Sequence, residues 1–246
     1  MYSLPDNYVR VEGIKNPSNA GINTGYKCNI NSRIEIKTNL VRPTTSSYIH
    51  LALSKSPGMT TTSGSGWYIH TNGNLYIYIG GGNNTIFNST TVSSNLEKFF
   101  TFIEDYKTSK HIAKDENGNV VKSITHTRSG ATTDTYPFGL FGRNGLNDTA
   151  TTTGQIINYF RLYDYESESY VRYYIPCINE NGVAGFFDAA RGVFQGSGNS
   201  TAFEPVFEGN TEISEIFTSR TTANSSILNM QTAKLTSIKG NTLVWN

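Results

Sequence analysis

Charged residues are scarce in this sequence, and neither sign predominates. Asp, Glu, Lys and Arg make up 16% of the 246 residues, and the formal net charge is +1. Nucleic-acid-binding proteins concentrate Lys and Arg where these side chains neutralise phosphates, whereas the basic residues Lys107, Lys110 and Lys114 are interleaved with acidic ones. No apolar run approaches the ~20 residues that a membrane-spanning helix needs. We therefore expect neither a nucleic-acid partner nor a membrane partner.

Cysteine and histidine are also few, which restricts disulfide and metal chemistry. The chain has two cysteines, Cys28 and Cys177, and four histidines. The cysteines could form one disulfide, but the favoured interpretation is that each packs as a small apolar residue. The histidines lie in separate segments, with no pair at metal-ligand spacing. We therefore expect no zinc site and no cofactor.

Patterns that support catalysis are missing as well. Retaining glycosidases need two carboxyl groups ~5–5.5 Å apart, and the nearest candidates here are Asp164, Glu166 and Glu168. Alternate residues share one face of a strand, but these acids surround a predicted hairpin tip, where water solvates a carboxylate. No serine lies in a Gly-x-Ser-x-Gly nucleophile turn. We predict that the chain is not an enzyme.

The residues that are abundant favour β-structure. Aromatic residues reach 12%, and 23 glycines accompany many Asn, Ser and Thr residues. Residues 33–40 alternate between apolar and polar side chains, which is typical of a strand with one face in water. Residues 67–79 predict a hairpin around an Asn-Gly turn. About a dozen such segments, ~8–12 residues apart, favour an all-β antiparallel jelly-roll sandwich.

The sequence changes character near Gly209. Residues 1–208 carry the strand pattern, whereas residues 210–237 lose aromatic density and become rich in Thr, Ser and Asn. We interpret 209–246 as a C-terminal arm for oligomerisation or anchoring. So short a segment forms no core of its own, and symmetric self-association is a common way to bury an appended apolar segment. The apolar residues of this arm are Ile213, Ile216, Phe217, Leu243, Val244 and Trp245.

Two stretches of the chain carry a family resemblance. The first runs from LPDNY at 4–8 to SRIEI at 32–36, and the second from VRYYIPC at 171–177 to GVF at 192–194. In content and order they resemble concanavalin A-like (laminin G-like) lectin and glucanase modules of gut Bacteroidales bacteria and their phages. The resemblance covers residues 4–207 and implies the same jelly-roll sandwich. The first stretch departs from the family pattern at one polar position: residues 21–23 read Gly-Ile-Asn and lack the Asp that the family has there.

The end of the chain points to a biological context. IKGNTLVWN at 238–246 is similar to a segment of gut phage structural proteins. The resemblance implies a fibre or decoration protein on a virion surface, which binds host-surface polysaccharide, contacts other virion proteins and forms a homo-oligomer. A purely structural virion component and an extracellular bacterial surface adhesin are the alternatives. Residues 1–5 lack the features of a secretory signal, so we expect either a removed signal or release within an assembly.

Two candidate sites remain. Sugars bind to an aromatic face flanked by planar polar side chains, and Trp67, Tyr68, His70, Asn72 and Asn74 cluster at the predicted hairpin. Alternatively, Trp67 belongs to the core, and the two asparagines only form the turn. Laminin G-like modules often hold calcium with loop carboxylates, and the resemblance therefore makes Asp148 a weak calcium candidate. The alternative for that residue is an Asx turn.

Overall fold

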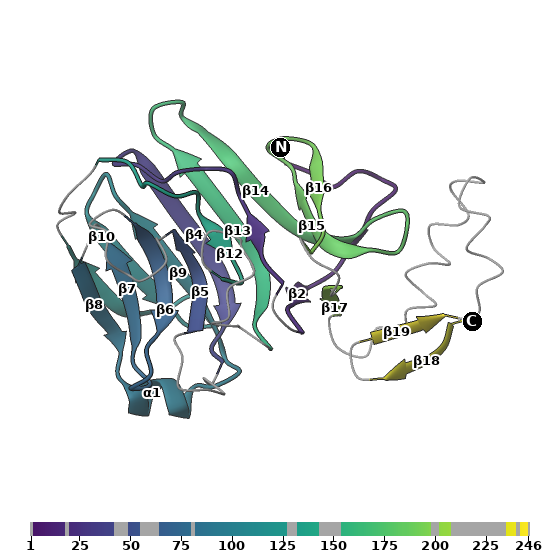
Figure 1. Ribbon diagram of the computed structural model, residues 1–246, viewed down its shortest axis with the longest axis horizontal. Coiled ribbons are helices and arrows are strands. Elements are labelled where there is room, and N and C mark those ends of the chain that lie inside the picture. Colours follow the sequence, from purple (N-terminus) through teal and green to yellow (C-terminus); the bar gives the residue numbers. More distant parts are fainter. Residues whose placement is uncertain are drawn as a thin grey trace.

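Two antiparallel β-sheets pack against each other in the computed structural model (Figure 1). The structure describes residues 2–17, 20–41, 49–54, 64–79, 82–126, 132–142, 154–197, 202–207, 235–239 and 242–245. His50 and the last two of these stretches are described by their backbone alone. The all-β jelly-roll sandwich predicted from the sequence is confirmed.

The larger sheet is built from strands that are far apart in sequence. Its order is β11-β10-β9-β4-β13-β14-β15-β16, with β1 paired to β14 and with β2 paired to both β13 and β17. The strands are β1 (Val9–Arg10), β2 (Gly13–Lys15), β4 (Ser32–Asn39), β9 (Phe99–Asp105), β10 (Lys110–Lys114), β11 (Val120–Thr125), β13 (Ile156–Asp164), β14 (Ser169–Ile178), β15 (Ala184–Asp188), β16 (Val193–Gln195) and β17 (Glu204–Val206).

The smaller sheet has the order β3-β12-β5-β6-β7-β8. Its strands are β3 (Ile22–Asn23), β12 (Gly139–Leu140), β5 (Ile49–Ser54), β6 (Ser65–Ile69), β7 (Leu75–Ile79) and β8 (Gly82–Phe87). The predicted hairpin forms β6 and β7, and Gly73 in its turn has a φ of +81°, which explains the glycine there. The short helix α1 (Ser89–Ser94) follows β8, and the Asn88 side chain caps its N-terminus by accepting from the Thr91 amide.

Strand β4 shows how the sequence pattern produces the two faces of the larger sheet. Ile34 and Ile36 are buried, whereas the intervening Arg33, Glu35 and Lys37 lie on the outer face. Asn39 departs from this alternation, because it is also buried. Its side chain accepts from the Ile156 amide at 2.7 Å and donates to the Gly154 carbonyl, so it satisfies backbone groups at the start of β13.

A continuous run of aromatic rings joins the two sheets across the core. Trp67 on β6 packs on Phe138, with ring centroids 6.2 Å apart, and Phe138 stacks on Phe160 of β13 at 5.6 Å. The run continues through Tyr174 to Phe186, with centroid separations of 5.6 and 6.0 Å. All five side chains are fully buried. Each buries a large apolar area, and tilted and stacked pairs contribute about 0.5–1.5 kcal/mol beyond that burial.

Both cysteines are buried in the sandwich, and no disulfide joins them. Burial raises the pKa of the Cys177 thiol to about 12. A thiol that stays protonated at neutral pH is a poor nucleophile and a poor metal ligand. Cys177 therefore contributes packing rather than chemistry, which agrees with the interpretation as a small apolar residue.

One carboxylate lies inside the sandwich between two histidines. Glu104 on β9 has no exposed surface, and its Oε1 lies 2.5 Å from Nε2 of His126. Its Oε2 lies 3.4 Å from Nδ1 of His111, whose ring contacts Trp67. A buried carboxylate is tolerated only where partners compensate for its lost hydration. The imidazoles of β10 and of the segment after β11 lie at ion-pair distance and are the groups placed to supply this compensation, although neither contact has hydrogen-bond geometry. They link the β10–β11 edge of the larger sheet to the core.

The C-terminal segment is described only in part. Strands β18 (Leu235–Lys239) and β19 (Thr242–Trp245) pair as a separate two-stranded hairpin, and β19 contains Leu243, Val244 and Trp245. Ile213, Ile216 and Phe217 lie outside the described residues. The sandwich itself continues to β17, where Pro205 pairs with Ile14. The boundary near Gly209 and the docking of the arm stay predictions.

We predict that Glu104→Ala lowers the free energy of unfolding by about 3 kcal/mol or more, because two buried imidazoles lose their shared partner. Urea denaturation followed by tryptophan fluorescence measures this change. Glu12→Ala, which removes an exposed carboxylate, should stay within about 0.5 kcal/mol of the unmodified protein. Equal stability of the two variants would contradict a compensating role for the Glu104 pairs.

We predict that a chain ending at residue 208 keeps a cooperatively folded sandwich, because β17 already closes the larger sheet against β2. Its free energy of unfolding should stay within about 1 kcal/mol of that of the full chain, as expected when no core contact is lost. Circular dichroism and urea denaturation of the two proteins provide the comparison. Loss of the cooperative transition would place the arm in the core and move the boundary.

Candidate functional site

The β6–β7 hairpin, where the sequence predicts a sugar site, separates its residues onto two faces. Trp67 is fully buried in the core, and this prediction is corrected: its ring has no exposed face for a sugar. Tyr68 points to the opposite face, where it is buried against Tyr76 with ring centroids 5.5 Å apart. The two-residue period of a strand imposes this split on neighbouring aromatic residues.

The polar residues of the hairpin use their side chains on the hairpin itself. Asn72 and Asn74 both donate to the hydroxyl of Tyr76, at 3.2 and 3.1 Å, and these hydrogen bonds lower the pKa of that phenol. The Asn74 side-chain oxygen Oδ1 accepts from the Ser89 amide at the start of α1, and His70 Nδ1 accepts from the Asn72 amide. His70, Asn72 and Asn74 thus hold the turn and anchor α1. Asn72 is exposed, and His70 and Asn74 are partly exposed.

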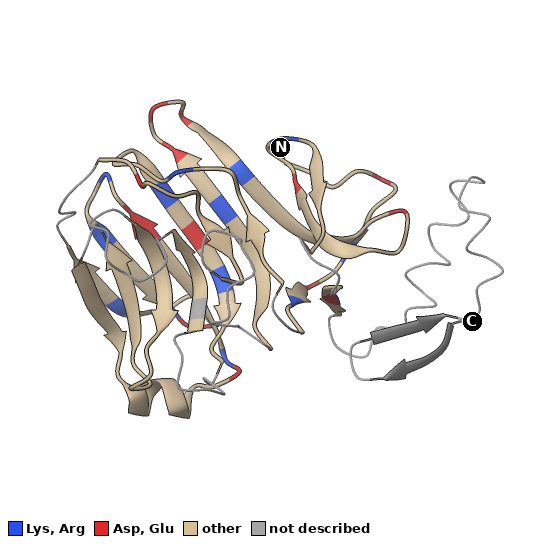
Figure 2. Cartoon of the chain, viewed as in Figure 1, with Lys and Arg blue, Asp and Glu red and all other residues tan. Residues whose placement is uncertain are grey.

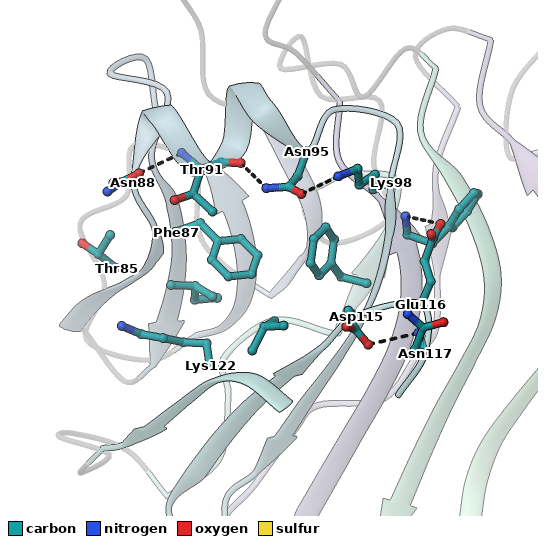
Figure 3. A pocket seen from close by; sticks show the side chains of 14 residues that line it. Thr85, Phe87, Asn88, Thr91, Asn95, Lys98, Asp115, Glu116, Asn117 and Lys122 are labelled. Atoms are coloured by element: carbon teal, nitrogen blue, oxygen red, sulfur yellow. Dashed lines mark hydrogen bonds between the residues drawn. The ribbon is translucent and has the colours of Figure 1, made fainter. Parts of the chain in front are cut away.

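A cleft lies at one edge of the sandwich, where β8 and α1 face the β10–β11 hairpin (Figure 3). Its volume is about 760 Å³, which is within the range of ligand pockets. The lining residues come from both sheets and from the helix. They are Thr85, Ile86, Phe87, Asn88, Thr91, Asn95, Lys98, Phe99, Phe100, Asp115, Glu116, Asn117, Val121 and Lys122.

Aromatic side chains form the base of the cleft. Phe87 at the end of β8 and Phe100 on β9 are nearly buried, and their ring centroids lie 5.2 Å apart. Both rings also pack on Phe102 of the core, with centroid separations of 6.4 and 6.1 Å. Phe99 alternates with Phe100 and remains partly exposed. The base is therefore a rigid apolar surface rather than a set of mobile side chains.

One wall of the cleft is a chain of hydrogen-bonded polar residues from α1 and the segment after it. Asn95 donates from Nδ2 to the Thr91 carbonyl at 2.8 Å, and its Oδ1 accepts from the Lys98 ammonium at 3.1 Å. Asn88 closes the other end by accepting from the Thr91 amide at 2.8 Å. Because these bonds fix the amides before any ligand arrives, the wall loses little conformational entropy on binding.

The opposite wall is the turn between β10 and β11. Asp115 accepts hydrogen bonds from the amides of Asn117 and Asn119 and from the Asn119 side chain, at 3.0, 2.8 and 3.1 Å. These bonds, the one from the Asn119 side chain first among them, lower the pKa of Asp115. Glu116 accepts from the Phe99 amide at 3.2 Å and so ties the turn to the start of β9. The wall carries carboxylate oxygens next to exposed amides.

The arrangement suits hydrogen bonding more than acid–base chemistry. Amides, carboxylates and ammonium groups stand around an apolar base, and in ligand pockets a few polar groups on such a lining fix the orientation of the ligand. Asp164, the other acidic candidate, caps its own turn by accepting from the amides of Glu166 and Ser167. Glu166 and Glu168 are exposed at that turn.

The described ranges contain neither a metal-binding cluster nor a membrane-spanning helix. There, no group of three His, Cys, Asp or Glu side chains is arranged to hold a metal ion. Asp148, the calcium candidate, lies outside the described residues. Within the same ranges, no helix is long and apolar enough to cross a bilayer, and α1 has only 6 residues.

Comparisons with known proteins give structural neighbours at low similarity. No protein-family profile matches the chain, and no curated protein matches it. Domains LG4-5 of the mouse laminin alpha1 chain align at 16% identity and a TM-score of 0.42, covering 83% of this chain and 46% of that one. The CBM40 module of a Ruminococcus gnavus IT-sialidase aligns at 13% identity and a TM-score of 0.40, covering 63% and 90%.

A Trypanosoma rangeli sialidase in complex with the inhibitor DANA aligns at 13% identity and a TM-score of 0.36. That alignment covers 56% of this chain and 20% of the sialidase. The chain thus spans about half of the laminin structure and about a fifth of the sialidase.

We predict that the Asp115 carboxyl titrates below its ordinary value of 3.8 in the folded protein. A carboxyl whose pKa is lower folded than unfolded stabilises the turn above the unfolded pKa, and this stabilisation is lost as the pH falls through the folded pKa. Carbon-detected NMR of the carboxyl measures the midpoint. Asn119→Ala removes the side-chain donor and should raise it.

Asn117→Ala is the matched control for this titration, because Asn117 bonds Asp115 only through its backbone amide. Its titration midpoint should equal that of the unmodified protein. Equal midpoints in all three proteins would show that the Asn119 side chain does not set the charge state of this wall.

Proposed function

We propose that this chain is a non-enzymatic glycan-binding protein whose sandwich holds saccharides in the cleft between α1 and the β10–β11 turn. The observation that carries the proposal is the cleft itself: an aromatic base between two walls of amides that are already hydrogen-bonded. A pre-organised polar wall favours binding, because less entropy is lost when the ligand arrives.

We extend the proposal to the context that the sequence indicates. The protein would be a fibre or decoration protein of a bacteriophage virion, would bind host-surface polysaccharide, and would associate with copies of itself and with other virion proteins through the arm at 209–246. This part rests on the sequence resemblance of residues 238–246. A purely structural virion component and a bacterial surface adhesin remain the alternatives.

A glycan array followed by calorimetry tests the binding proposal. The double variant Lys98→Ala/Asn117→Ala removes one ammonium and one amide from facing walls of the cleft. We expect it to weaken binding of the best array ligand about tenfold, since each lost hydrogen bond costs about 0.5–1.5 kcal/mol. No binding to any array glycan would overturn the proposal and favour the purely structural alternative.

Asn181→Ala provides the control, because the 179–183 turn repeats the local chemistry of the 115–119 turn away from the cleft. The Asn179 side chain accepts from the amides of Asn181 and Val183, as Asp115 does from those of Asn117 and Asn119. Asn181→Ala should bind as tightly as the unmodified protein. Equal weakening by the control and the double variant would place the ligand elsewhere.

The virion context is tested by mass spectrometry of purified phage particles. We expect the full chain in the particles, and we expect the chain truncated at residue 208 to be lost from them while it stays folded. Recovery only in the bacterial envelope fraction would reject the virion proposal and support the adhesin alternative.

A further inference from the structure

The outer face of the larger sheet gathers tyrosines and basic side chains. The strand register places Arg161 of β13 beside Glu35 of β4 and Tyr173 of β14, and it places Tyr163 beside Arg33 and Tyr170. These strands are neighbours in Figure 1, and Figure 2 shows the basic and acidic segments that they carry side by side. None of these residues lines the cleft at the sandwich edge.

A pocket of about 260 Å³ opens in this face, much smaller than the cleft. Arg33, Glu35, Arg161, Tyr163, Tyr165 and Tyr170 line it. The tyrosines hold one another edge-to-face, with the Tyr163 ring 5.2 Å from Tyr165 and 5.4 Å from Tyr170. Tyr165 is also fixed by the hydrogen bond from its hydroxyl to Asp105, at 2.8 Å. The pocket therefore has a formed aromatic wall.

Arg161 is held in place by stacking rather than by hydrogen bonds. Its guanidinium carbon lies 4.5 Å from the ring centroid of Tyr159 and 4.9 Å from that of Tyr173. Its Nη1 is 3.8 Å from Glu35, beyond hydrogen-bond distance, and its Nε is buried without an acceptor in the described part of the chain. The side chain is thus ordered and keeps donor capacity for a ligand.

Charge on this face favours an anion. Glu35 accepts from the Tyr159 hydroxyl at 2.8 Å and lies 3.8 Å from both guanidinium groups, so one carboxylate stands between two cations. Burial raises the pKa of Tyr159 to about 12, so its hydroxyl remains a donor at neutral pH.

Basic side chains outnumber acidic ones across the outward positions of β4, β9, β10, β13 and β14. The described basic side chains there are Arg33, Lys37, Lys110, Lys114 and Arg161, and the acidic ones are Glu35 and Asp105. The five basic side chains exceed the two acidic ones by three positive charges, which is more than the net charge of the whole chain, +1.

We propose that this pocket binds the carboxylate-bearing unit of an acidic saccharide, as a second site that is distinct from the cleft. The planar guanidinium fork of Arg161 matches a carboxylate in geometry, and Arg33 supplies the second cation. Tyr163, Tyr165 and Tyr170 provide ring surface for one sugar. Glu35 accepts from sugar hydroxyls and excludes ligands that offer only negative charge.

Calorimetry with matched ligand pairs tests this proposal. Trigalacturonate is compared with its methyl ester, and sialyllactose with lactose, so each pair differs by the presence of free carboxylates. We expect one acidic ligand to bind at least tenfold more tightly than its uncharged counterpart, and the acidic ligand that binds identifies its source. Equal affinity within both pairs, or no binding of either acid, would overturn the proposal.

Three variants locate the site. Arg33→Gln and Arg161→Gln should each weaken binding of the acid about tenfold or more, whereas Lys37→Gln on the same face removes an equal charge outside the pocket and should leave affinity within about twofold. Equal weakening by all three variants would mean that the field of the face, and not the pocket, attracts the ligand. Arg33 is the more exposed of the two arginines, with 42% of its side chain accessible, so Arg33→Gln tests the site even if Arg161→Gln unfolds.

The two sites can fail independently. Lys98→Ala/Asn117→Ala should leave acid binding at the pocket unchanged, and Arg33→Gln should leave binding of an uncharged glycan at the cleft unchanged. Loss of acid binding in the cleft variant would assign the acid to the cleft and reject the second site.

Discussion

The packing of one sheet on the other depends on the run of rings from Trp67 through Phe138, Phe160 and Tyr174 to Phe186. Each ring is buried and contacts the next, so the run links β6 of the smaller sheet to β15 at the far side of the larger one. Interiors of this kind are close-packed, and they transmit the position of one strand to its neighbours. The core therefore fixes the relative positions of the strands that form the cleft and the outer face.

The same core explains how the two candidate surfaces differ. The cleft lies between the β8 edge of the smaller sheet and the β10–β11 edge of the larger one, and its walls are turns and a helix held by hydrogen bonds to backbone groups. The pocket on the outer face is formed by side chains that project from the middle of paired strands, with Arg161 held between two tyrosine rings. A glycan-binding cleft and an acid-binding pocket would thus sit on two different parts of one rigid scaffold.

The sequence predicts the fold but neither of the two candidate sites, for identifiable physical reasons. Period-two alternation in residues 33–38 and the Asn-Gly turn at Asn72 report local geometry, and both predictions are confirmed. The period-two pattern places Trp67 and Tyr68 on opposite faces of their strand, but it does not indicate which of the two faces the larger sheet covers. The cleft joins Asn88, Asn95 and Asp115, and no local pattern reveals that β8 and the β10–β11 turn meet. The pocket likewise requires that β4 lies beside β13, a pairing of segments more than a hundred residues apart.

The pairing of β2 with β17 has a consequence for the order in which the chain folds. Gly13–Lys15 receives its second partner from Glu204–Val206, and Val9 pairs with Ile178. A non-local strand pair loses the entropy of closing a long loop before its stabilising contacts form. Topologies that are rich in such pairs therefore fold slowly. During synthesis, β2 keeps one edge unpaired until residue 206 of β17 has left the ribosome. The sandwich is therefore completed after translation of its whole length, and the interval before closure is when its exposed edges are most open to aggregation.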